Sequence, residues 1–489
     1  MNRYLPLIVV IIPILGSLII PLIDNEHRKL RCIYIESLVL INTILVFLAL
    51  INNTGEICEF IRFTGNLSIS FRIDGLSVVF SALVAFLWPL ATLYSFEYMT
   101  KEKHEKIFFM FYTMTYGVTL GIAMAEDFVS LYCFYELLTL VTVPLVIHSF
   151  SREAILAARK YLYYSLGGAA FAFIGMIFII TYSTTNEFTY GGVLDMAKVG
   201  DRANILLLIY VLTFMGFSVK AAMFPFSGWL PQAGVAPTPV TALLHAVAVV
   251  KSGAFAIMRI TYYSFGADFV RGTWAQNIVM LFTVFTIVYG CSKALKETHL
   301  KRRLAYSTIS NLSYILFGVT LMTPLGLVGA LSHLVFHAFM KISSFFCAGA
   351  IMHQTEKHYI HELDGLGRRM PITFCIFTVS SLALMGVPGL AGFVSKWNLA
   401  TAAAQSNNRL GYIGIGALLI SALLTAIYMM SIVMRAFEPG NDFNDEKISQ
   451  YKDPNILMIL PLVIFTIVVI IFGLHSQPFV EYFRQIAGL

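Results

Sequence analysis

The sequence has little charge and few cysteines. Only 12% of the 489 residues are Asp, Glu, Lys or Arg and 58% are hydrophobic, which excludes an ordinary soluble globular protein. The six cysteines are scattered without a CxxC pair, so we expect no iron–sulfur cluster and no zinc. Neither GxxxxGK[ST] nor a paired-glycine dinucleotide motif occurs, so no nucleotide cofactor is expected. Any redox or ATP chemistry would belong to another subunit.

Long polar segments are also lacking. The longest polar stretches are 53–73, 183–202 and 437–454, and no linker rich in Gly, Ser or Pro separates parts of the chain. We therefore treat residues 1–489 as a single polytopic membrane domain. The last stretch contains the acidic PGNDFNDEKISQYKDP, which predicts a surface loop.

What the sequence does contain is apolar runs along almost its whole length. We predict an all-α integral membrane protein with about 14 transmembrane helices, because each run is long enough to cross about 30 Å of hydrocarbon. A barrel strand would need only about 10 residues of alternating character. The predicted spans are approximately 4–23, 31–52, 74–99, 107–125, 127–149, 154–182, 203–226, 238–263, 274–295, 304–323, 326–352, 371–399, 411–436 and 455–475. The first run, with its two prolines and no cleavage site, is interpreted as a retained span rather than a signal peptide.

Basic residues collect in alternate short loops. These are Arg28, Lys29 and Arg31; Lys101, Lys103 and Lys106; Arg152, Arg159 and Lys160; Lys293, Lys296, Lys301, Arg302 and Arg303; and Lys357, Arg368 and Arg369. The positive-inside rule makes these loops cytoplasmic and places both termini on the non-cytoplasmic side of the cell membrane. The same distribution argues against nucleic acid as a partner, although the net charge is +6.

Proline and glycine interrupt two of the spans, KAAMFPFSGWLPQAGVAPTP (220–239) and LMGVPGLAGFVSK (384–396). Irregular backbone at membrane depth is tolerated only where it is buried in protein or faces a wet cavity. Broken helices at matching positions of two halves are typical of ion pathways in transporters built from inverted repeats. We therefore predict repeats at approximately 107–263 and 274–436; proline kinks that only improve packing are the alternative. The expected breaking residues are Pro225, Pro231, Pro237, Gly386, Pro388 and Gly389.

Charged residues lie deep in several spans. Each ammonium at mid-bilayer costs about 2.5–3.5 kcal/mol, so such residues normally face the bundle interior and mark a pathway. The lysines in question are Lys220, Lys251, Lys341 and Lys396. Glu136 is the carboxylate that we place deep in a span, whereas Glu126 and Asp127 are predicted to form a solvated cap. A Glu–Lys pair with variable separation would change the proton affinity of both groups; the alternative is a fixed salt bridge.

Two histidines accompany these lysines in HLVFHAFMKISSFF. His333, His337 and Lys341 are spaced i, i+4, i+8, which spreads them over about 80° of arc and about 12 Å of helix axis. This stripe suits a proton relay; a metal site is the alternative, but a third ligand is lacking nearby. On a continuous helix, His245 and Lys251 would be about 240° and about 9 Å apart, so they would meet different neighbours.

Several motifs resemble the antiporter-like subunits shared by respiratory complex I, membrane-bound hydrogenases and multi-subunit Na⁺/H⁺ antiporters. They are FRIDGLS (71–77), DFVSLYCFYELLTL (127–140), SVKAAMFPFSGWLPQAGVAPTPVTALLHAVAVVKSGAFAIMR (218–259), HLVFHAFMKISSFFCAG (333–349) and GVPGLAGFVSKW (386–397). The resemblance implies about 14 helices with two inverted repeats of about five helices each, and half-channels joined by a hydrated lysine chain. The chain ends soon after its last span, so we expect it to resemble the shorter members, particularly those of the D type in the antiporters.

Carried over residue by residue, the resemblance assigns roles to the buried charges. Glu136 and Lys220 match the modulating ion pair, and Lys251 matches a lysine of the central polar axis with His245 beside it. The eleventh-span group is matched by His333, His337 and Lys341, and the end of the proton path by Lys396.

These expectations combine into a hypothesis of proton translocation, with or without exchange for Na⁺, by one component of a multi-subunit membrane complex. The expected partners are other membrane subunits, including homologous antiporter-like ones, a peripheral redox module and lipid. The chain itself would carry no redox chemistry, whether or not its parent complex is an NADH:quinone oxidoreductase or a hydrogenase. The alternatives are a passive scaffold anchoring a redox module, a single-chain solute transporter and a Na⁺-carrying subunit.

Overall fold

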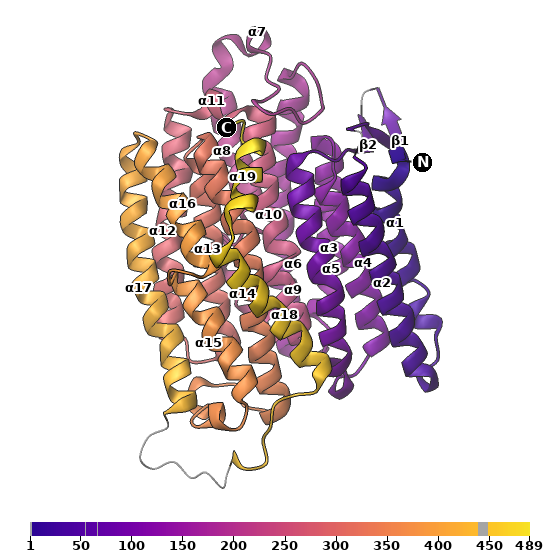
Figure 1. Cartoon of the computed structure of the whole chain (residues 1–489). Coiled ribbons are helices and arrows are strands. Elements are labelled where there is room, and N and C mark those ends of the chain that lie inside the picture. Colours follow the sequence, from indigo (N-terminus) through magenta and orange to yellow (C-terminus); the bar gives the residue numbers. More distant parts are fainter. Residues whose placement is uncertain (1, 54, 66, 439–447) are drawn as a thin grey trace. The chain divides into compact units, whose positions relative to one another are not determined.

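A computed structural model describes residues 2–53, 55–65, 67–438 and 448–489 (Figure 1). The predicted acidic loop at 437–454 thus lies largely outside the described residues. The described chain is helical apart from one hairpin, which confirms the all-α membrane class. Its longer helices are α1 (Leu5–Ser17), α2 (Arg28–Ile51), α3 (Gly75–Tyr98), α4 (Glu105–Ala123), α5 (Phe128–Val146), α6 (Arg152–Tyr182), α8 (Ala203–Ser218), α9 (Thr238–Ala246), α10 (Val249–Met258), α12 (Trp274–Lys296), α13 (Leu300–Thr320), α14 (Pro324–Thr355), α15 (Pro371–Met385), α16 (Ala391–Gln405), α17 (Arg409–Phe437), α18 (Ile456–Leu474) and α19 (Gln477–Ile486).

Within the described ranges, 12 helical segments are long and apolar enough to cross a membrane. Two predicted spans are not among them. The span at 304–323 corresponds to α13, which is rich in Ser, Thr and Asn, and the span at 371–399 is divided into α15 and α16. The number of about 14 spans and the inverted repeats stay predictions.

The chain forms two compact units. Unit 1 contains Met1–Thr92, Lys103–Ala221 and Val247–Val279. Unit 2 contains Leu93–Glu102, Ala222–Ala246 and Met280–Leu489. The segment 222–246, which contains the prolines of the first predicted break, thus belongs to unit 2 although it lies between two parts of unit 1 in the sequence.

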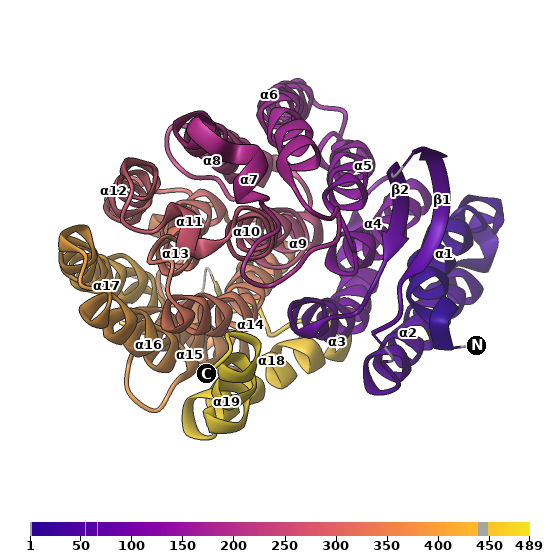
Figure 2. The ribbon, with the colours of Figure 1, turned by 90° about the horizontal axis from the view of Figure 1, so that it is seen from above.

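Unit 1 is a set of adjacent helices in which α1 packs on α2 and α4, α4 on α5, α5 on α6, and α6 on α8 (Figure 2). Small residues allow close approach: a Cβ on Gly168 of α6 would lie 2.6 Å from the carbonyl oxygen of Gly216 in α8. Unit 1 also contains an antiparallel hairpin, β1 (Cys58–Thr64) and β2 (Leu67–Phe71), within the stretch predicted only as polar.

Unit 2 is organised around α14, which contacts α9, α13, α15, α16 and α18 (Figure 2). Because α14 is surrounded in this way, the whole of its most apolar stretch is buried, including the two histidines and the lysine of the HLVFHAFMKISSFF segment. A hydrophobic cluster between α12, α13, α16 and α17 completes the core, with Phe317 and Leu399 fully buried.

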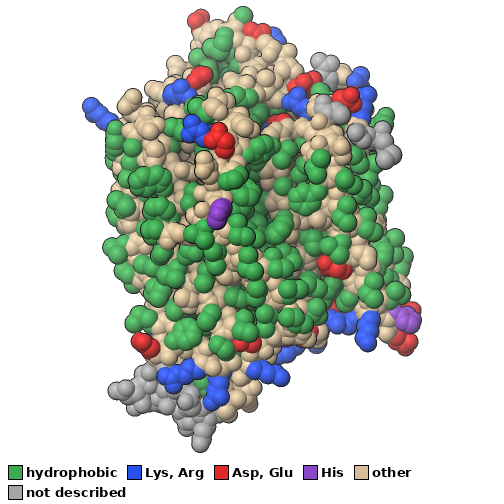
Figure 3. Space-filling view, in the orientation of Figure 1, with side chains coloured by type: hydrophobic (Ala, Val, Ile, Leu, Met, Phe, Trp, Pro, Cys, Tyr) green, Lys and Arg blue, Asp and Glu red, His purple; other side chains and the backbone are tan. Residues whose placement is uncertain are grey.

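The flanks of the outer helices expose large hydrophobic side chains. Ile33, Ile44 and Ile51 of α2 and Leu419 and Leu423 of α17 are all more than half exposed. Figure 3 shows such hydrophobic side chains along the helix flanks, with the charged side chains at the helix ends. Lipid or partner helices would cover these flanks, in agreement with a membrane location.

The helices stop at both predicted interruptions. The predicted span 203–226 is wrong beyond Ser218, where α8 ends; short 3₁₀ turns follow, and α9 begins at Thr238. The second interruption extends from Gly386 to Leu390, and Gly386 has a left-handed φ of 92°, which a side chain would strain.

A further break divides the predicted span 238–263. Helix α9 ends at Ala246, α10 begins at Val249, and a π-helical turn occupies Arg259–Phe265. The angular separation predicted for His245 and Lys251 on a continuous helix is therefore wrong. Neither proline nor glycine lies at residues 247–248, so the local sequence carries no ordinary signal for this break.

Candidate functional site

Lys220 of unit 1 is fully buried directly after the end of α8. Its Nζ donates a hydrogen bond to the backbone carbonyl of Tyr135 in α5 and lies 3.4 Å from the centroid of the Tyr135 ring. Gly253 of α10 makes room for this segment, because a Cβ there would lie 2.6 Å from the backbone nitrogen of Ala221. The interruption of the helix thus lets a lysine reach the side of a neighbouring helix.

Glu136 follows Tyr135 on α5 and is partly buried. Its Oε1 atom is buried without a hydrogen-bond partner in the described part of the chain. The ammonium of Lys220 therefore lies beside the backbone of the preceding residue, near the carboxylate but bonded to a carbonyl. This arrangement brings the predicted pair together as neighbours while leaving one carboxylate oxygen available.

Lys251 is fully buried on α10, in the same unit as Glu136 and Lys220. It lies two residues before Gly253, the point at which α10 meets the Lys220 segment. Helix α10 also contacts α4, α5 and α8. Unit 1 therefore holds three of the predicted charged residues on elements that pack on one another.

In unit 2, the stripe on α14 is completely buried, with His333, His337 and Lys341 each 0% exposed. The rings of the two histidines stack with their centroids 5.4 Å apart, and His333 Nδ1 is 2.9 Å from the hydroxyl of Ser395 on α16. Lys341 Nζ donates to the carbonyl of Leu304 on α13 at 3.1 Å. The predicted i, i+4, i+8 spacing thus produces one continuous polar face inside the core.

Lys396 of α16 closes the end of the broken helix α15. Its Nζ donates to the carbonyls of Leu384 at 2.6 Å and Met385 at 3.0 Å. The last carbonyls of a helix have no intrahelical donor and carry the negative end of the helix dipole, so they attract a cation. Its ammonium also lies 5.4 Å from the ring centroid of Tyr314.

His245 lies at the end of α9 in unit 2 and is fully buried. Both of its ring nitrogens lack a hydrogen-bond partner in the described part of the chain, and its ring is 4.8 Å from that of Phe345. A buried imidazole without a partner is costly, so a water molecule would supply the missing contact of His245.

A metal site was the alternative for the histidine stripe. No group of three His, Cys, Asp or Glu residues that could hold a metal ion occurs in the ranges that the structure describes. His333 of the stripe instead contacts the hydroxyl of Ser395 and the ring of Tyr314.

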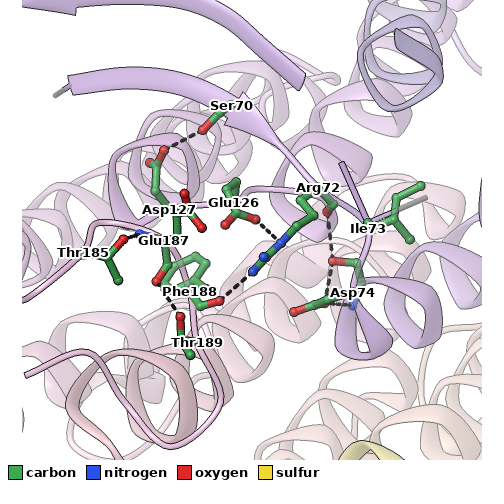
Figure 4. Close-up of polar contacts among 12 residues, drawn as sticks. Ser70, Arg72, Ile73, Asp74, Glu126, Asp127, Thr185, Glu187, Phe188 and Thr189 are labelled. Carbon is green, nitrogen blue, oxygen red and sulfur yellow. Dashed lines mark hydrogen bonds and ion pairs between the residues drawn. The ribbon is translucent and has the colours of Figure 1, made fainter. Parts of the chain in front are cut away.

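A separate ionic cluster in unit 1 lies around the segments that precede α3 and α5 (Figure 4). Arg259 donates to both carboxylate oxygens of Asp74, with Nη2 to Oδ1 at 2.7 Å, and also to Ser77. Arg72 pairs with Glu126, with Nε to Oε2 at 2.6 Å. Although burial raises the pKa of the Asp74 carboxyl, Arg259 outweighs it and holds that pKa at about 2.

The prediction of a solvated cap at Glu126 and Asp127 is wrong in one respect. Asp127 does cap α5 by accepting from the backbone nitrogen of Ser130, but Glu126 and Asp127 are only 3% and 6% exposed. The hairpin covers them, since Ser70 of β2 donates to Asp127 at 2.7 Å (Figure 4). Burial raises the pKa of Glu126 to about 8, although Arg72 and Arg259 lower it.

Comparison with known families places the chain that carries these residues. Residues 125–425 match the family described as "NADH:quinone oxidoreductase/Mrp antiporter, TM". The chain belongs to this family. Residues 60–109 also match the "NADH-Ubiquinone oxidoreductase (complex I), chain 5 N-terminus".

Curated relatives of this family member are components of antiporters. The A-type subunit of the Na⁺/H⁺ antiporter of Alkalihalophilus pseudofirmus (strain OF4) is 28% identical over 94% of this chain. The A1-type subunit of the Staphylococcus aureus antiporter is 29% identical over 96% of it. The chain spans about 60% of the length of these relatives. They are of the A type, whereas the length of the chain suggested the D type.

Two solved structures share the fold. The Mrp complex from Dietzia sp. DQ12-45-1b contains a chain that is 21% identical, with a TM-score of 0.85; the match covers 99% of this chain and 52% of that one. The membrane-bound sulfane sulfur reductase, an archaeal respiratory membrane complex, contains one that is 22% identical, with a TM-score of 0.82 and coverage of 100% and 96%. The antiporter-like fold is thus shared over the whole described chain.

Sequence reasoning missed two features of this family member. One is the cluster of Arg72, Asp74, Glu126 and Arg259, whose partners are far apart in the sequence. The other is Glu36, a half-buried carboxylate in the span of α2 with its Oε2 atom buried and unpartnered in the described part of the chain. A single acidic residue in the apolar run 31–52 was the available signal for Glu36.

Proposed function

We propose that this chain is a proton-translocating, antiporter-like subunit that moves H⁺ in exchange for Na⁺ within a multi-subunit membrane complex. One observation carries the proposal: Lys220, Lys251 and Lys341 are each 0% exposed inside apolar helical bundles. Insertion of each ammonium costs about 2.5–3.5 kcal/mol, and a membrane protein retains such groups mainly where they act.

The bonding of the lysines supports a role in proton transfer. Lys220, Lys341 and Lys396 all donate to backbone carbonyls. A carbonyl orients an ammonium without neutralising it, so the lysine can release its proton and remain in a polar contact. An ion pair with a fixed carboxylate would instead hold the charge in place.

Glu136 provides the variable partner in this proposal. When the Lys220 ammonium moves from the Tyr135 carbonyl toward Glu136, the two opposite charges stabilise each other and the proton affinity of Lys220 rises. When it returns, the affinity falls and the proton can pass on. Unit 1 would thus carry the gated part of the path through Glu136, Lys220 and Lys251, and unit 2 the part through His245, His333, His337, Lys341 and Lys396.

The expected partners follow from the relatives and the flanks. The similar structures are a multi-subunit Mrp complex and an archaeal respiratory membrane complex, so we propose that other membrane subunits, including homologous ones, and lipid cover the exposed hydrophobic flanks. A peripheral redox module is an alternative source of driving force. We further propose that both termini lie on the non-cytoplasmic side of the cell membrane.

The test is proton and sodium movement in vesicles that contain the intact parent complex. Lys220→Met and Glu136→Gln should each reduce transport by about tenfold or more, because each removes one member of the gating pair. Lys296→Met, an exposed lysine at the end of α12, is the matched control and should transport normally. Normal transport by both core variants in an assembled complex would refute the proposal.

The same vesicles separate the two remaining alternatives. A Na⁺-carrying path would need a cluster of oxygen ligands, so transport should then survive Lys341→Met and fail when carboxylates are neutralised. A passive scaffold would tolerate Lys220→Met, Lys341→Met and Lys396→Met alike, as long as the complex assembles.

A further inference from the structure

A polar cavity opens beside the ionic cluster of unit 1. Its volume is about 640 Å³, and its walls come from the N-terminus, the hairpin, the start of α5 and the 183–198 segment. The residues that line it include Ser70, Glu126, Asp127, Thr185 and Glu187. This volume is enough for many water molecules, and the polar walls would hold them in place.

Glu126 is the side chain of this wall whose bonding is incomplete. It is only 3% exposed, and its Oε2 pairs with Arg72. Its Oε1 is buried and has no hydrogen-bond partner in the described part of the chain. Asp127, by contrast, accepts from Ser70 and Ser130, so both of its oxygens are used.

We propose that Glu126 is the group through which unit 1 exchanges protons with water in this cavity. In the step, hydronium transfers a proton to the free Oε1 of the carboxylate, which forms one O–H bond and leaves water; the reverse step returns the proton. No electron moves and no other reactant is required. The proposal rests on the proposed function and names the proton-exchange group at one end of the path.

The surroundings allow Glu126 to change its charge in the physiological range. Burial raises its pKa to about 8, while Arg72 and Arg259 favour the ionised form and Glu187 and Asp74 oppose it. The other charged groups around the cavity are Arg3, Glu59, Arg62, Asp127 and Lys198. A carboxyl with a pKa of about 8 is suited to exchange protons with water.

The cluster also connects this wall with the buried lysines of the same unit. Arg259 lies eight residues after Lys251 along the segment formed by α10 and its π-helical turn, so about 12 Å of helix separates them. Arg259 holds Asp74. Arg72, two residues before Asp74 in the sequence, holds Glu126 (Figure 4). Arg259, on the segment that continues from Lys251, acts electrostatically on Glu126.

The test uses the intact complex in vesicles, with proton movement measured while the pH on the cavity side is varied from about 6.5 to about 9.5. Glu126→Gln should lower transport by about tenfold and remove the inflection near pH 8. Glu126→Asp should keep activity with a shifted inflection. Glu59→Gln, which alters an exposed carboxylate of the same cavity, is the matched control and should keep the wild-type profile.

Lys220→Met in the same assay separates this inference from the proposed function. If Lys220→Met stops transport while Glu126→Gln keeps the wild-type rate and profile, the inference is overturned and the proposed function stands. If Lys220→Met transports normally, both are overturned. If Glu126→Gln fails to assemble, Glu126→Asp decides: an unshifted profile overturns the inference, and a shifted one supports it.

Discussion

A buried lysine and a buried arginine of unit 1 bond to different kinds of partner. Lys220 bonds to a backbone carbonyl, whereas Arg259 bonds to both oxygens of Asp74. A guanidinium stays charged in proteins and matches a carboxylate in two places, so its ion pair is a permanent structural element. A lysine without a fixed counter-ion holds a proton that can leave. The comparison separates the charges that build unit 1 from those that would transport.

Of the substitutions that test this comparison, the largest effect is expected for the removal of Arg259. Arg259→Leu should destabilise unit 1 by about 3–5 kcal/mol, because Asp74 would remain as an uncompensated, largely buried charge. Thermal unfolding of the purified complex measures the effect. Arg259→Lys should recover only part of the loss, since an ammonium cannot bond both oxygens in the same way. Full stability of Arg259→Leu would show that the pair is not structural.

The pH dependence of stability tests whether the Arg259–Asp74 pair is a structural element. The pKa of Asp74 is about 2 in the fold and 3.8 in an unperturbed carboxyl, so its stabilisation is present above about pH 4 and is lost as pH falls toward 2. The contribution is about 2 kcal/mol. Unfolding followed between about pH 5 and pH 2 should show this loss in the wild type and a weaker one in Asp74→Asn.

The close approach at Gly253 tests how Lys220 is positioned. Gly253→Ala should cost about 1–3 kcal/mol and lower transport, because the new methyl group would displace the Ala221 backbone and with it Lys220. Gly167→Ala on α6 is the matched control, since its Cβ would meet no atom within 4 Å. Equal stability and transport of the two variants would contradict the assigned packing.

The smallest expected effect is at Ser395. Ser395→Ala removes the hydroxyl next to His333 Nδ1 and should cost about 0.5–1.5 kcal/mol, the usual net value of one hydrogen bond. The transport rate should fall only slightly. The pH optimum of transport should shift, because His333 loses a fixed orientation. An unchanged pH profile would indicate that His333 takes no part in proton transfer.

The predictions made from local sequence were accurate where the signal was local. The apolar runs predicted the helical membrane class, and the prolines and glycines lie between the end of α8 and the start of α9 and between α15 and α16. The break between α9 and α10 could not be predicted, because no helix-breaking residue lies at 247–248. Its position depends on the neighbours of these helices and not on local propensity.

The contacts of the candidate site also fall into two groups: those that the local sequence predicts and those that it does not. The spacing of His333, His337 and Lys341 was sufficient to place them on one buried face, since a helix brings i and i+4 together. The pairs Arg259–Asp74 and Arg72–Glu126 join residues separated by 185 and 54 positions, which periodicity cannot detect. The burial of Glu126 likewise depends on a hairpin that the sequence showed only as a polar stretch.

By itself, the sequence determined the membrane location of this protein, its helical class and the charges placed in its spans. Only helices and closed barrels can span hydrocarbon, the apolar runs have the length of helices, and charged residues are rare within such runs. Only the tertiary structure decided which cations are neutralised by a carboxylate and which are not. That distinction depends on whether folding brings a carboxylate or a backbone carbonyl to each cation, and such contacts join residues that are distant in the chain.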